Sequence, residues 1–365
     1  MINSSKNKKI ILFTDSLGAG GAQRQLVGLA VMLKEVGYSV TVATYHNLDF
    51  YKSQLDEMHV RNVLIPDAEN SKKRIMAVRS FFKHENPDCV IAYQETPSLV
   101  ACLARVAGCK FRLIVSERNT TQIVGANERI RFFLYRWAYA IVPNSYAQQF
   151  FLSTHYTWMK CKIKTITNFV DIEYFNFEEK IKRDVPEIVV VATIWQPKNT
   201  IGLIEAARML VANGLRFHIS WYGKSASNIE YYNECLQRIQ KFELEEYIAL
   251  KEKTKNIKQI YKGADFFCLP SFYEGTPNVL CEAMSCGRPI ICSAVCDNPI
   301  YVKEGENGFL FNPRETKAIA NALEKALAIT DDKYSIFCKQ SREKAERLLS
   351  QKTFVDKYIK IIEDK

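Results

Sequence analysis

The feature that most constrains this chain is an alternation of short apolar runs with amphipathic stretches. It begins with a β-forming run at 9–14, a glycine-containing turn at 15–21 and a helical pattern at 22–36 that ends before Gly37. A second β-forming run follows at 39–44. Two strands joined by a helix form a βαβ crossover, in which the strands lie parallel in one sheet. The sequence therefore predicts an α/β fold with parallel strands.

The alternation restarts after a polar stretch at 171–187, and a chain of 365 residues has room for two domains. We therefore predict a Rossmann-like domain at 1–175, a second one at 188–345, and a C-terminal helix at 346–365 that packs back on the first domain. Because such sheets bind ligands at the carboxyl ends of their strands, we expect the site in a cleft between the domains. Further strands are predicted at 89–92, 111–116, 140–142, 165–168, 188–193, 216–222, 266–269 and 289–292, and helices at 200–213, 228–242, 277–286 and from 317 onward.

The net charge of +10 is unevenly distributed. Residues 1–185 carry 25 Lys and Arg against 17 Asp and Glu, a surplus of 8, whereas the remainder carries 25 against 23. The surplus favours an anionic partner for the first half, such as a phospholipid surface or a phosphorylated acceptor, although a merely soluble basic surface is the simpler alternative. No recognised nucleic-acid-binding motif occurs. Without a signal peptide or a run of about 20 apolar residues, the chain is expected to stay in the cytoplasm.

Two loops carry candidate ligand-binding residues. Gly18, Gly20 and Gly21 stand between the first strand and the first helix, where the backbone can approach a ligand and helix-start N–H groups favour an anion. A plain tight turn is the alternative. The second loop joins a strand to a helix and holds Glu274 and Glu282 with seven residues between them. These carboxylates could grip two hydroxyl-bearing parts of one ligand, or be a capping residue and a solvated one.

This second loop resembles the E-x7-E motif of glycosyltransferase family 4, whose members are retaining enzymes of the GT-B type. The similarity covers the whole segment LPSFYEGTPNVLCEAMSCGRPII, which looks like the donor-binding segment of that family. The resemblance implies two Rossmann-like domains that face each other across a cleft. Further segments are similar to landmarks of the family: GAGGAQRQL, VATIWQPKN, KNIKQIYKGADFFCLPS and NGFLFNP.

The resemblance also implies residue roles. Glu274 would bind hydroxyls of the transferred sugar, and Glu282 would bind the ribose hydroxyls of the nucleotide. Lys198 would stabilise the diphosphate as the bond breaks, so Glu274 and Lys198 are the expected catalytic residues. The set expected around the donor comprises Gly20, Gly21, Thr193, Lys198, Glu274, Gly275, Asn278, Val279 and Glu282.

Two further positions concern the diphosphate and the acceptor. Thr193 stands where the family usually has arginine, so a charge-assisted hydrogen bond worth about 1.5–3 kcal/mol is missing or supplied elsewhere. The stretch Ser116–Asn119 resembles a motif of members that extend lipid-linked bacterial glycans. The resemblance places Glu117 and Arg118 near the acceptor or the donor phosphate, whereas the spacing alone also allows an ion pair at the strand end.

Two stretches, 72–84 and 129–139, mix basic with aromatic residues. Amphipathic basic helices can lie on an anionic leaflet, but core helices with arginines that reach solvent have the same pattern. The D-x-D triplet of metal-dependent glycosyltransferases does not occur, and no two histidines have metal-ligand spacing. We therefore predict no metal and no cofactor.

Taken together, these features predict a metal-independent retaining glycosyltransferase. Its expected donor is a nucleotide-sugar, most simply a UDP-sugar, and its expected acceptor is a polyprenyl-diphosphate-linked saccharide of bacterial surface polysaccharide, such as O-antigen or capsule. Such an enzyme would lie peripherally on the inner face of the cytoplasmic membrane. The alternatives are an epimerase or hydrolase of the same fold, and a non-catalytic module that binds nucleotide-sugars.

Overall fold

The structure is a computed structural model that describes residues 8–68, 70–121, 123–224 and 228–364. It divides into two compact units, which are described separately. Unit 1 extends to Asn168 and also contains the stretch from Lys352 onward, and unit 2 is Phe169–Gln351. The chain thus passes from one unit to the other after residue 168 and again after residue 351.

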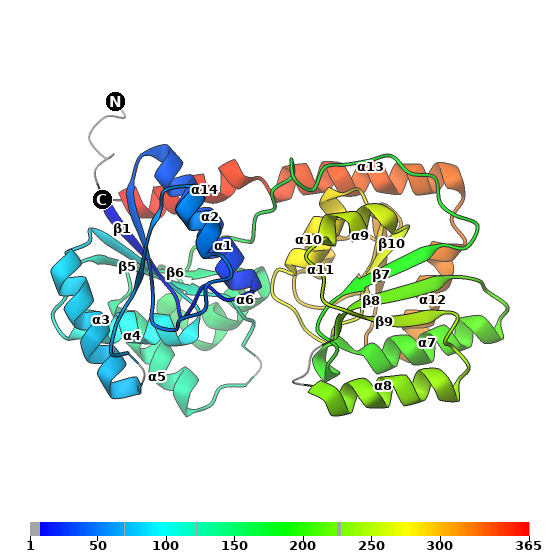
Figure 1. Cartoon of the computed structure of the whole chain (residues 1–365), viewed down its shortest axis with the longest axis horizontal. Helices are drawn as coiled ribbons and strands as arrows, with labels where there is room; N and C mark the ends of the chain where they lie inside the picture. Colours follow the sequence, from blue (N-terminus) through cyan, green and yellow to red (C-terminus); the bar gives the residue numbers. More distant parts are fainter. Residues whose placement is uncertain (1–7, 69, 122, 225–227, 365) are drawn as a thin grey trace. The chain divides into compact units, whose positions relative to one another are not determined.

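Unit 1 is built on a six-stranded parallel sheet in the order β3-β2-β1-β4-β5-β6. Figure 1 shows helices on both faces of this sheet. The central strands β1 and β4 are apolar and almost wholly buried, as expected for a parallel sheet that is covered twice. The strands are β1 (Lys9–Phe13), β2 (Ser39–Thr44), β3 (Arg61–Leu64), β4 (Cys89–Tyr93), β5 (Arg112–Glu117) and β6 (Ala140–Pro143). The helices are α1 (Gly21–Val36), α2 (Lys52–Glu57), α3 (Ser71–Glu85), α4 (Glu95–Val106), α5 (Ala126–Leu134) and α6 (Tyr146–His155), with 3-10 turns η1 (Tyr135–Trp137) and η2 (Thr157–Met159).

Unit 2 is a second six-stranded parallel sheet, in the order β12-β11-β10-β7-β8-β9. One face packs around Trp221 and the other around Tyr261 and the apolar side of α10. The strands are β7 (Glu187–Val191), β8 (His218–Lys224), β9 (Ile248–Glu252), β10 (Phe266–Leu269), β11 (Ile290–Ser293) and β12 (Gly308–Phe311). The helices are α7 (Thr200–Ala212), α8 (Ile229–Lys241), α9 (Ile257–Gly263), α10 (Asn278–Ser285), α11 (Asn298–Tyr301), α12 (Thr316–Leu327) and α13 (Asp331–Leu348), with the 3-10 turn η3 (Gln196–Lys198).

The two sheets have the same topology. In each sheet the first three strands are added side by side toward one edge and the last three toward the other edge, while all six stay parallel. The order therefore reverses between β1 and β4 in unit 1 and between β7 and β10 in unit 2. Open α/β sheets bind their ligands outside the carboxyl ends of the strands at this switch point. The residues that follow these four strands therefore form the candidate sites, and the α/β class with parallel sheets predicted from the sequence is confirmed.

The last helix, α14 (Gln351–Glu363), completes unit 1. Its Tyr358 hydroxyl lies 3.0 Å from that of Tyr93 at the end of β4, and Arg112 donates to the carbonyl oxygen of Ile361 at 2.7 Å. Within the described ranges, the helices are all too short or too polar to cross a bilayer.

The strand predicted at 165–168 is wrong. These residues run beside β6, where Ile166 donates its N–H to the carbonyl oxygen of Pro143, but only one isolated bridge forms, between Ile141 and Ile163. A single bridge does not make a strand. The helical tail predicted from 317 onward is divided into α12, α13 and α14, and Thr330 caps α13 through the backbone N–H of Lys333.

Candidate active site

A lysine and a glutamate meet at the switch point of unit 2. Lys198 ends the turn η3 after β7, and Glu274 lies in the loop between β10 and α10. The Lys198 Nζ atom is 2.6 Å from Oε1 of Glu274, and the side chains are 24% and 10% exposed. The ion pair is therefore partly shielded from water but open to a ligand. The structure brings together the two residues that the family resemblance marks as catalytic.

The Lys198 turn is anchored on both sides. Asn199, which has a φ of 57°, donates from its side-chain amide to the carbonyl oxygen of Pro313 at 2.9 Å. On the other side, the backbone N–H of Phe272 donates to the carbonyl oxygen of Pro197 at 2.9 Å, which joins the turn to the Glu274 loop. The lysine is thus held against the glutamate by backbone contacts as well as by charge.

Glu282 lies deeper, on helix α10. It is 2% exposed, and its Oε2 accepts a hydrogen bond of 3.1 Å from the hydroxyl of Tyr261 on α9. The first intrahelical bond of α10 runs from Cys281 to the carbonyl oxygen of Pro277. The backbone N–H groups of Asn278 and Val279 therefore belong to the first turn, where the helix supplies no acceptor and the helix dipole favours an anion. Tyr261 was not singled out by the sequence.

The loop that carries Thr193 is fixed to the next strand. Gly223 in β8 has a φ of 157°, and a Cβ atom there would lie 1.8 Å from the carbonyl oxygen of Ala192. The indole Nε1 of Trp221 donates to the same oxygen at 2.7 Å. Glycine is therefore required at 223, because only glycine allows the backbone to come this close. No sequence pattern indicated this contact.

At the switch point of unit 1, neutral amide and hydroxyl side chains surround a single carboxylate, that of Asp15. Thr14 donates to Oε1 of Gln94 at 3.0 Å, and the side-chain amide of Gln23 donates to Oδ1 of Asp15 at 3.1 Å. Gln23 can take this position because residue 20 is glycine: a Cβ atom there would lie 2.2 Å from its Oε1. Gly20 and Gly21 thus stand beside this cluster, at the start of α1.

Gln94 has an unusual backbone conformation. Its φ of 73° and ψ of 174° fall in a region that is essentially restricted to glycine. Such strain costs about 1–3 kcal/mol and tends to occur at functional sites. The residue follows β4 directly and begins α4, so the strain aims its side chain at the switch point.

Glu117 lies in the interior of unit 1. It is 1% exposed and accepts hydrogen bonds from the hydroxyl of Tyr135 and, at 3.3 Å, from the side-chain amide of Gln148. The buried guanidinium of Arg131 lies 3.2 Å from its Oε1. Burial raises the pKa of Glu117, and the charge of Arg131 opposes this rise. The structure thus places Glu117 in a buried ion-pair network. This is the alternative that the sequence spacing allowed, an ion pair at the end of the strand.

Arg118 is also buried, and it stacks on Tyr93, with Cζ 4.8 Å from the ring centroid. Its guanidinium donates to the side-chain oxygen of Asn168, while its Nε has no hydrogen-bond partner among the described residues. Gln148 bonds both the backbone N–H and the hydroxyl of Thr121 at 2.8 Å. The loop after β5 is therefore held from beneath by Glu117 and Gln148.

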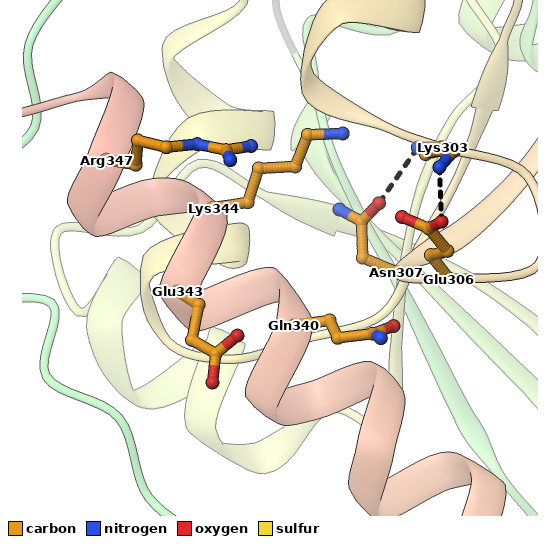
Figure 2. Close-up of a pocket in the computed structure, with 7 residues that line it drawn as sticks. All are labelled: Lys303, Glu306, Asn307, Gln340, Glu343, Lys344 and Arg347. Carbon is orange, nitrogen blue, oxygen red and sulfur yellow. Dashed lines mark hydrogen bonds and ion pairs between the residues drawn. The ribbon is translucent and has the colours of Figure 1, made fainter.

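Unit 2 also has two open hollows. One, of about 680 Å³, lies beside the Lys198 turn and is walled by Trp195, Tyr231 and Phe272. The other, of about 470 Å³, lies between α13 and the segment that precedes β12. It is therefore at the amino ends of the strands, whereas Lys198 lies at their carboxyl ends. Figure 2 shows that cations and carboxylates both line this second hollow: Lys303, Lys344, Arg347, Glu306 and Glu343. No group of three potential metal ligands occurs among the described residues, and the expected independence of metal remains a prediction.

Two family models match the chain in succession. The model described as Glycosyltransferase Family 4 matches residues 19–174, and the model described as Glycosyl transferases group 1 matches residues 171–346. Together they span both units.

The chain is also similar to bacterial proteins that are named as glycosyltransferases. An Escherichia coli protein described as UDP-Gal:alpha-D-GlcNAc-diphosphoundecaprenol alpha-1,3-galactosyltransferase is 32% identical over 198 residues, 50% of this chain and 49% of that protein. The match thus spans about half the length of that relative. A Campylobacter jejuni protein described as GalNAc-alpha-(1->4)-GalNAc-alpha-(1->3)-diNAcBac-PP-undecaprenol alpha-1,4-N-acetyl-D-galactosaminyltransferase is 24% identical over 340 residues, 89% of this chain and 90% of that protein.

Among solved structures, Anabaena HepE in complex with UDP and glucose superimposes with a TM-score of 0.87. The alignment covers 98% of this chain and 100% of that one at 19% identity. At this identity the similarity shows the fold alone.

Proposed function

Because this chain belongs to glycosyltransferase family 4 and has the GT-B fold, we propose that it transfers a sugar from a UDP-sugar to a lipid-linked saccharide. The observation that carries this proposal is the contact between Lys198 and Glu274 beside the first turn of α10. The E. coli and C. jejuni relatives support the substrate classes, since both names include an undecaprenol-linked acceptor and the E. coli name includes UDP-galactose. We extend this context to the present chain and propose that it acts in bacterial surface polysaccharide synthesis.

We assign the diphosphate to Lys198 and to the start of α10. The leaving group gains negative charge as the bond from the anomeric carbon to the phosphate oxygen breaks, and preorganised positive charge stabilises that state more than the ground state. Glu274 then has two tasks. It binds hydroxyls of the sugar, and it keeps Lys198 in place when the diphosphate is not there.

We propose that the reaction retains the configuration at the anomeric carbon. The acceptor hydroxyl attacks from the face that the diphosphate leaves, its oxygen bonds to the anomeric carbon, and its proton passes to the departing phosphate. No separate nucleophile is then needed. Glu282 binds the ribose from behind this site, with Tyr261 fixing its carboxylate.

In unit 1, we propose that the Asp15–Gln23–Gln94 cluster binds acceptor hydroxyls, because amide and carboxylate groups at a switch point suit a neutral sugar. Glu117 acts as a positioning residue, through Arg131 and the loop that carries Arg118. Arg118 itself is the residue of this loop best suited to a phosphate, because it carries the guanidinium group of the loop.

The test is a screen of UDP- and GDP-sugars with membrane extract as acceptor, followed by mass spectrometry. We expect one UDP-sugar to label a lipid-linked product, and the linkage to the new sugar to be of the retained anomer. Release of free sugar without any labelled lipid would support the hydrolase alternative, and binding without turnover would support a non-catalytic module. EDTA should leave the rate unchanged, because Lys198 supplies the charge that a metal would otherwise supply; loss of activity would contradict the metal-free mechanism.

A further inference from the structure

Unit 1 contains a hollow that is lined by cations. It has a volume of about 410 Å³ and lies at the amino ends of β5 and β6, whereas Gln94 follows the carboxyl end of β4. Among the described residues, no acidic side chain lines this cationic hollow, in contrast to the hollow of Figure 2, where both signs occur. Its lining residues are Arg105, Phe111, Arg112, Leu113, Trp137, Ala138, Tyr139 and Lys162.

The three cations of this hollow are held by backbone oxygens. Arg105 donates to the carbonyl oxygen of Cys109 at 3.0 Å, Arg112 to that of Ile361 at 2.7 Å, and Lys162 to that of Ala138 at 2.8 Å. Among the residues that the structure describes, none of the three forms a salt bridge, and Nε of Arg105 is buried without a hydrogen-bond partner. Carbonyl oxygens orient these groups but leave their charge uncompensated, which favours an added anion.

Aromatic rings and one nearby carboxylate complete the surroundings. Arg105 and Arg112 stack on Phe111 and Tyr139, with Cζ atoms 5.6 Å and 4.1 Å from the ring centroids. The Tyr139 hydroxyl bonds Asp364, which raises the pKa of this tyrosine. Burial lowers the pKa of Lys162, as expected for an ammonium group without a counter-ion. The net charge of the hollow therefore remains positive even with Asp364 beside it.

An exposed apolar stripe continues from the hollow along α5 and η1. Ile130, Phe133 and Trp137 are 54%, 54% and 39% exposed at helical spacing, and the rings of Phe133 and Trp137 are 5.8 Å apart. Arg136 stacks on Phe133 at 5.2 Å, and Trp137 also lines the hollow. Exposed apolar side chains that lie together on a surface are candidates for an interaction site.

The other basic stretch, helix α3, differs in this respect. Its Val78 and Phe82 are buried in the core of unit 1, and the large apolar side chain that it exposes is Met76. α3 is thus an ordinary core-packed helix with basic residues toward solvent, whereas α5 and η1 present aromatic residues to it.

We infer that the cationic hollow and the Ile130–Phe133–Trp137 stripe dock the chain on an anionic phospholipid bilayer. Lipid phosphates occupy the hollow between Arg105, Arg112 and Lys162, and the aromatic side chains enter the interfacial layer. Guanidinium groups match phosphate geometry, and tryptophan and phenylalanine bind at the level of the headgroups. The inference rests on the proposed function, because a lipid-linked acceptor lies in a bilayer.

The experiment is sedimentation of the purified chain with vesicles of phosphatidylcholine, alone or mixed with phosphatidylglycerol. We expect binding only to the mixed vesicles. Each cation near the surface contributes about a fivefold gain in affinity, so Arg105→Gln with Lys162→Gln should weaken binding about 25-fold. Phe133→Ser should weaken it about tenfold, because half of that side chain remains to be buried. The control Lys72→Gln with Lys73→Gln removes the same charge from α3 and should change binding less than about twofold.

Three outcomes would overturn the inference. Equal losses in the α3 control and in the hollow variant would mean that net charge alone attracts the chain. Unchanged vesicle binding by Phe133→Ser would show that the apolar stripe does not contact the bilayer. If inorganic phosphate binds the hollow by titration while the mixed vesicles do not bind, the hollow is a site for soluble phosphate.

Folding and the proposed function are checked separately. Thermal melting shows whether each variant is folded, and Phe133→Ser, at an exposed position, keeps the test valid if the hollow variant does not fold. A shift in melting temperature on addition of UDP measures donor binding without vesicles. Loss of vesicle binding with an unchanged UDP shift supports docking by this surface, whereas a wild-type chain that binds vesicles but never UDP or a UDP-sugar would contradict only the proposed transfer.

Discussion

The two units have the same sheet order but different chemistry at their switch points. In unit 2, the residues that follow β7 and β10 form an ion pair between Lys198 and Glu274. In unit 1, the residues that follow β1 and β4 form hydrogen bonds between Thr14 and Gln94, with Asp15 as the charged member nearby. Under the proposed function, the fold decides where a ligand meets each sheet, and the side chains decide whether the site stabilises charge or binds hydroxyl groups.

The charged residues of the two units also differ in burial. Glu117 and Arg131 of unit 1 are buried, whereas Lys198 and Glu274 remain partly exposed. Removal of one partner of a buried ion pair strongly destabilises a protein, whereas a partly exposed pair contributes little to stability. We therefore propose a structural role for the first pair and a chemical role for the second.

The largest effect should come from Glu117→Ala. Removal of this carboxylate takes the closest counter-ion from the buried guanidinium of Arg131 and leaves it only Glu95 and Glu128, whose oxygens lie 3.5 Å and 3.8 Å from Nη1, so the free energy of unfolding should fall by about 3 kcal/mol. Glu274→Ala should lower it by less than about 1 kcal/mol. Urea denaturation of both variants measures the difference. Similar stability of the two variants would contradict the structural role of Glu117 and leave this carboxylate available for a direct functional role.

The next largest effect should come from Lys198→Ala and Glu274→Ala, each of which should reduce the rate of sugar transfer at least about a hundredfold. The reason is the lost stabilisation of the departing diphosphate and the lost grip on the sugar. Initial rates with the identified UDP-sugar measure it. Arg238→Ala is a matched control, because it removes a cation that pairs with Glu205 at 2.8 Å on the surface of the same unit. Unchanged rates in folded Lys198→Ala would refute the site assignment.

A smaller effect is expected for Gln94→Gly. Glycine adopts this backbone conformation without strain, so the free energy of unfolding should rise by about 1 kcal/mol. The lost amide should raise the KM for the acceptor about three- to tenfold, as one hydrogen bond would. Asn86→Gly provides the control, because Asn86 also has a positive φ, 45°, but ends α3. If both variants gain stability and neither changes the KM, the cluster in unit 1 does not bind the acceptor.

The sequence predicted the regular elements well where apolar periodicity is strong. β2 and β10 were predicted with the bounds that the structure has, and α1 was predicted to within one residue. The strands β3, β9 and β12 were not predicted. RNVL and IALKE are short, mixed in polarity and largely exposed, and the four-residue GFLF was noted only as part of the NGFLFNP segment. The strand at 165–168 was wrong because its apolar residues pack beside β6 without forming a ladder.

Site residues could be predicted from the sequence where they belong to one continuous segment. Glu274, Glu282 and Lys198 were found by motif, since neighbouring residues define the pattern. The contact between Gln23 and Gln94 was not, because it depends on β1 and β4 becoming neighbours although about 80 residues separate them. One signal was available: Gln23 and Gln25 lie on the buried side of α1, where a helix of this kind normally has apolar residues.

The return of α14 to unit 1 has a consequence for how the chain is made. The N-terminal sheet can form its strand ladders early in synthesis, but Tyr93 and Arg112 must wait for Tyr358 and Ile361. These partners leave the ribosome only after all of unit 2 has been translated. A nascent chain therefore carries an incomplete first unit until α14 emerges. The surface of unit 1 that the buried apolar residues of α14 later cover is where chaperones would be expected to bind.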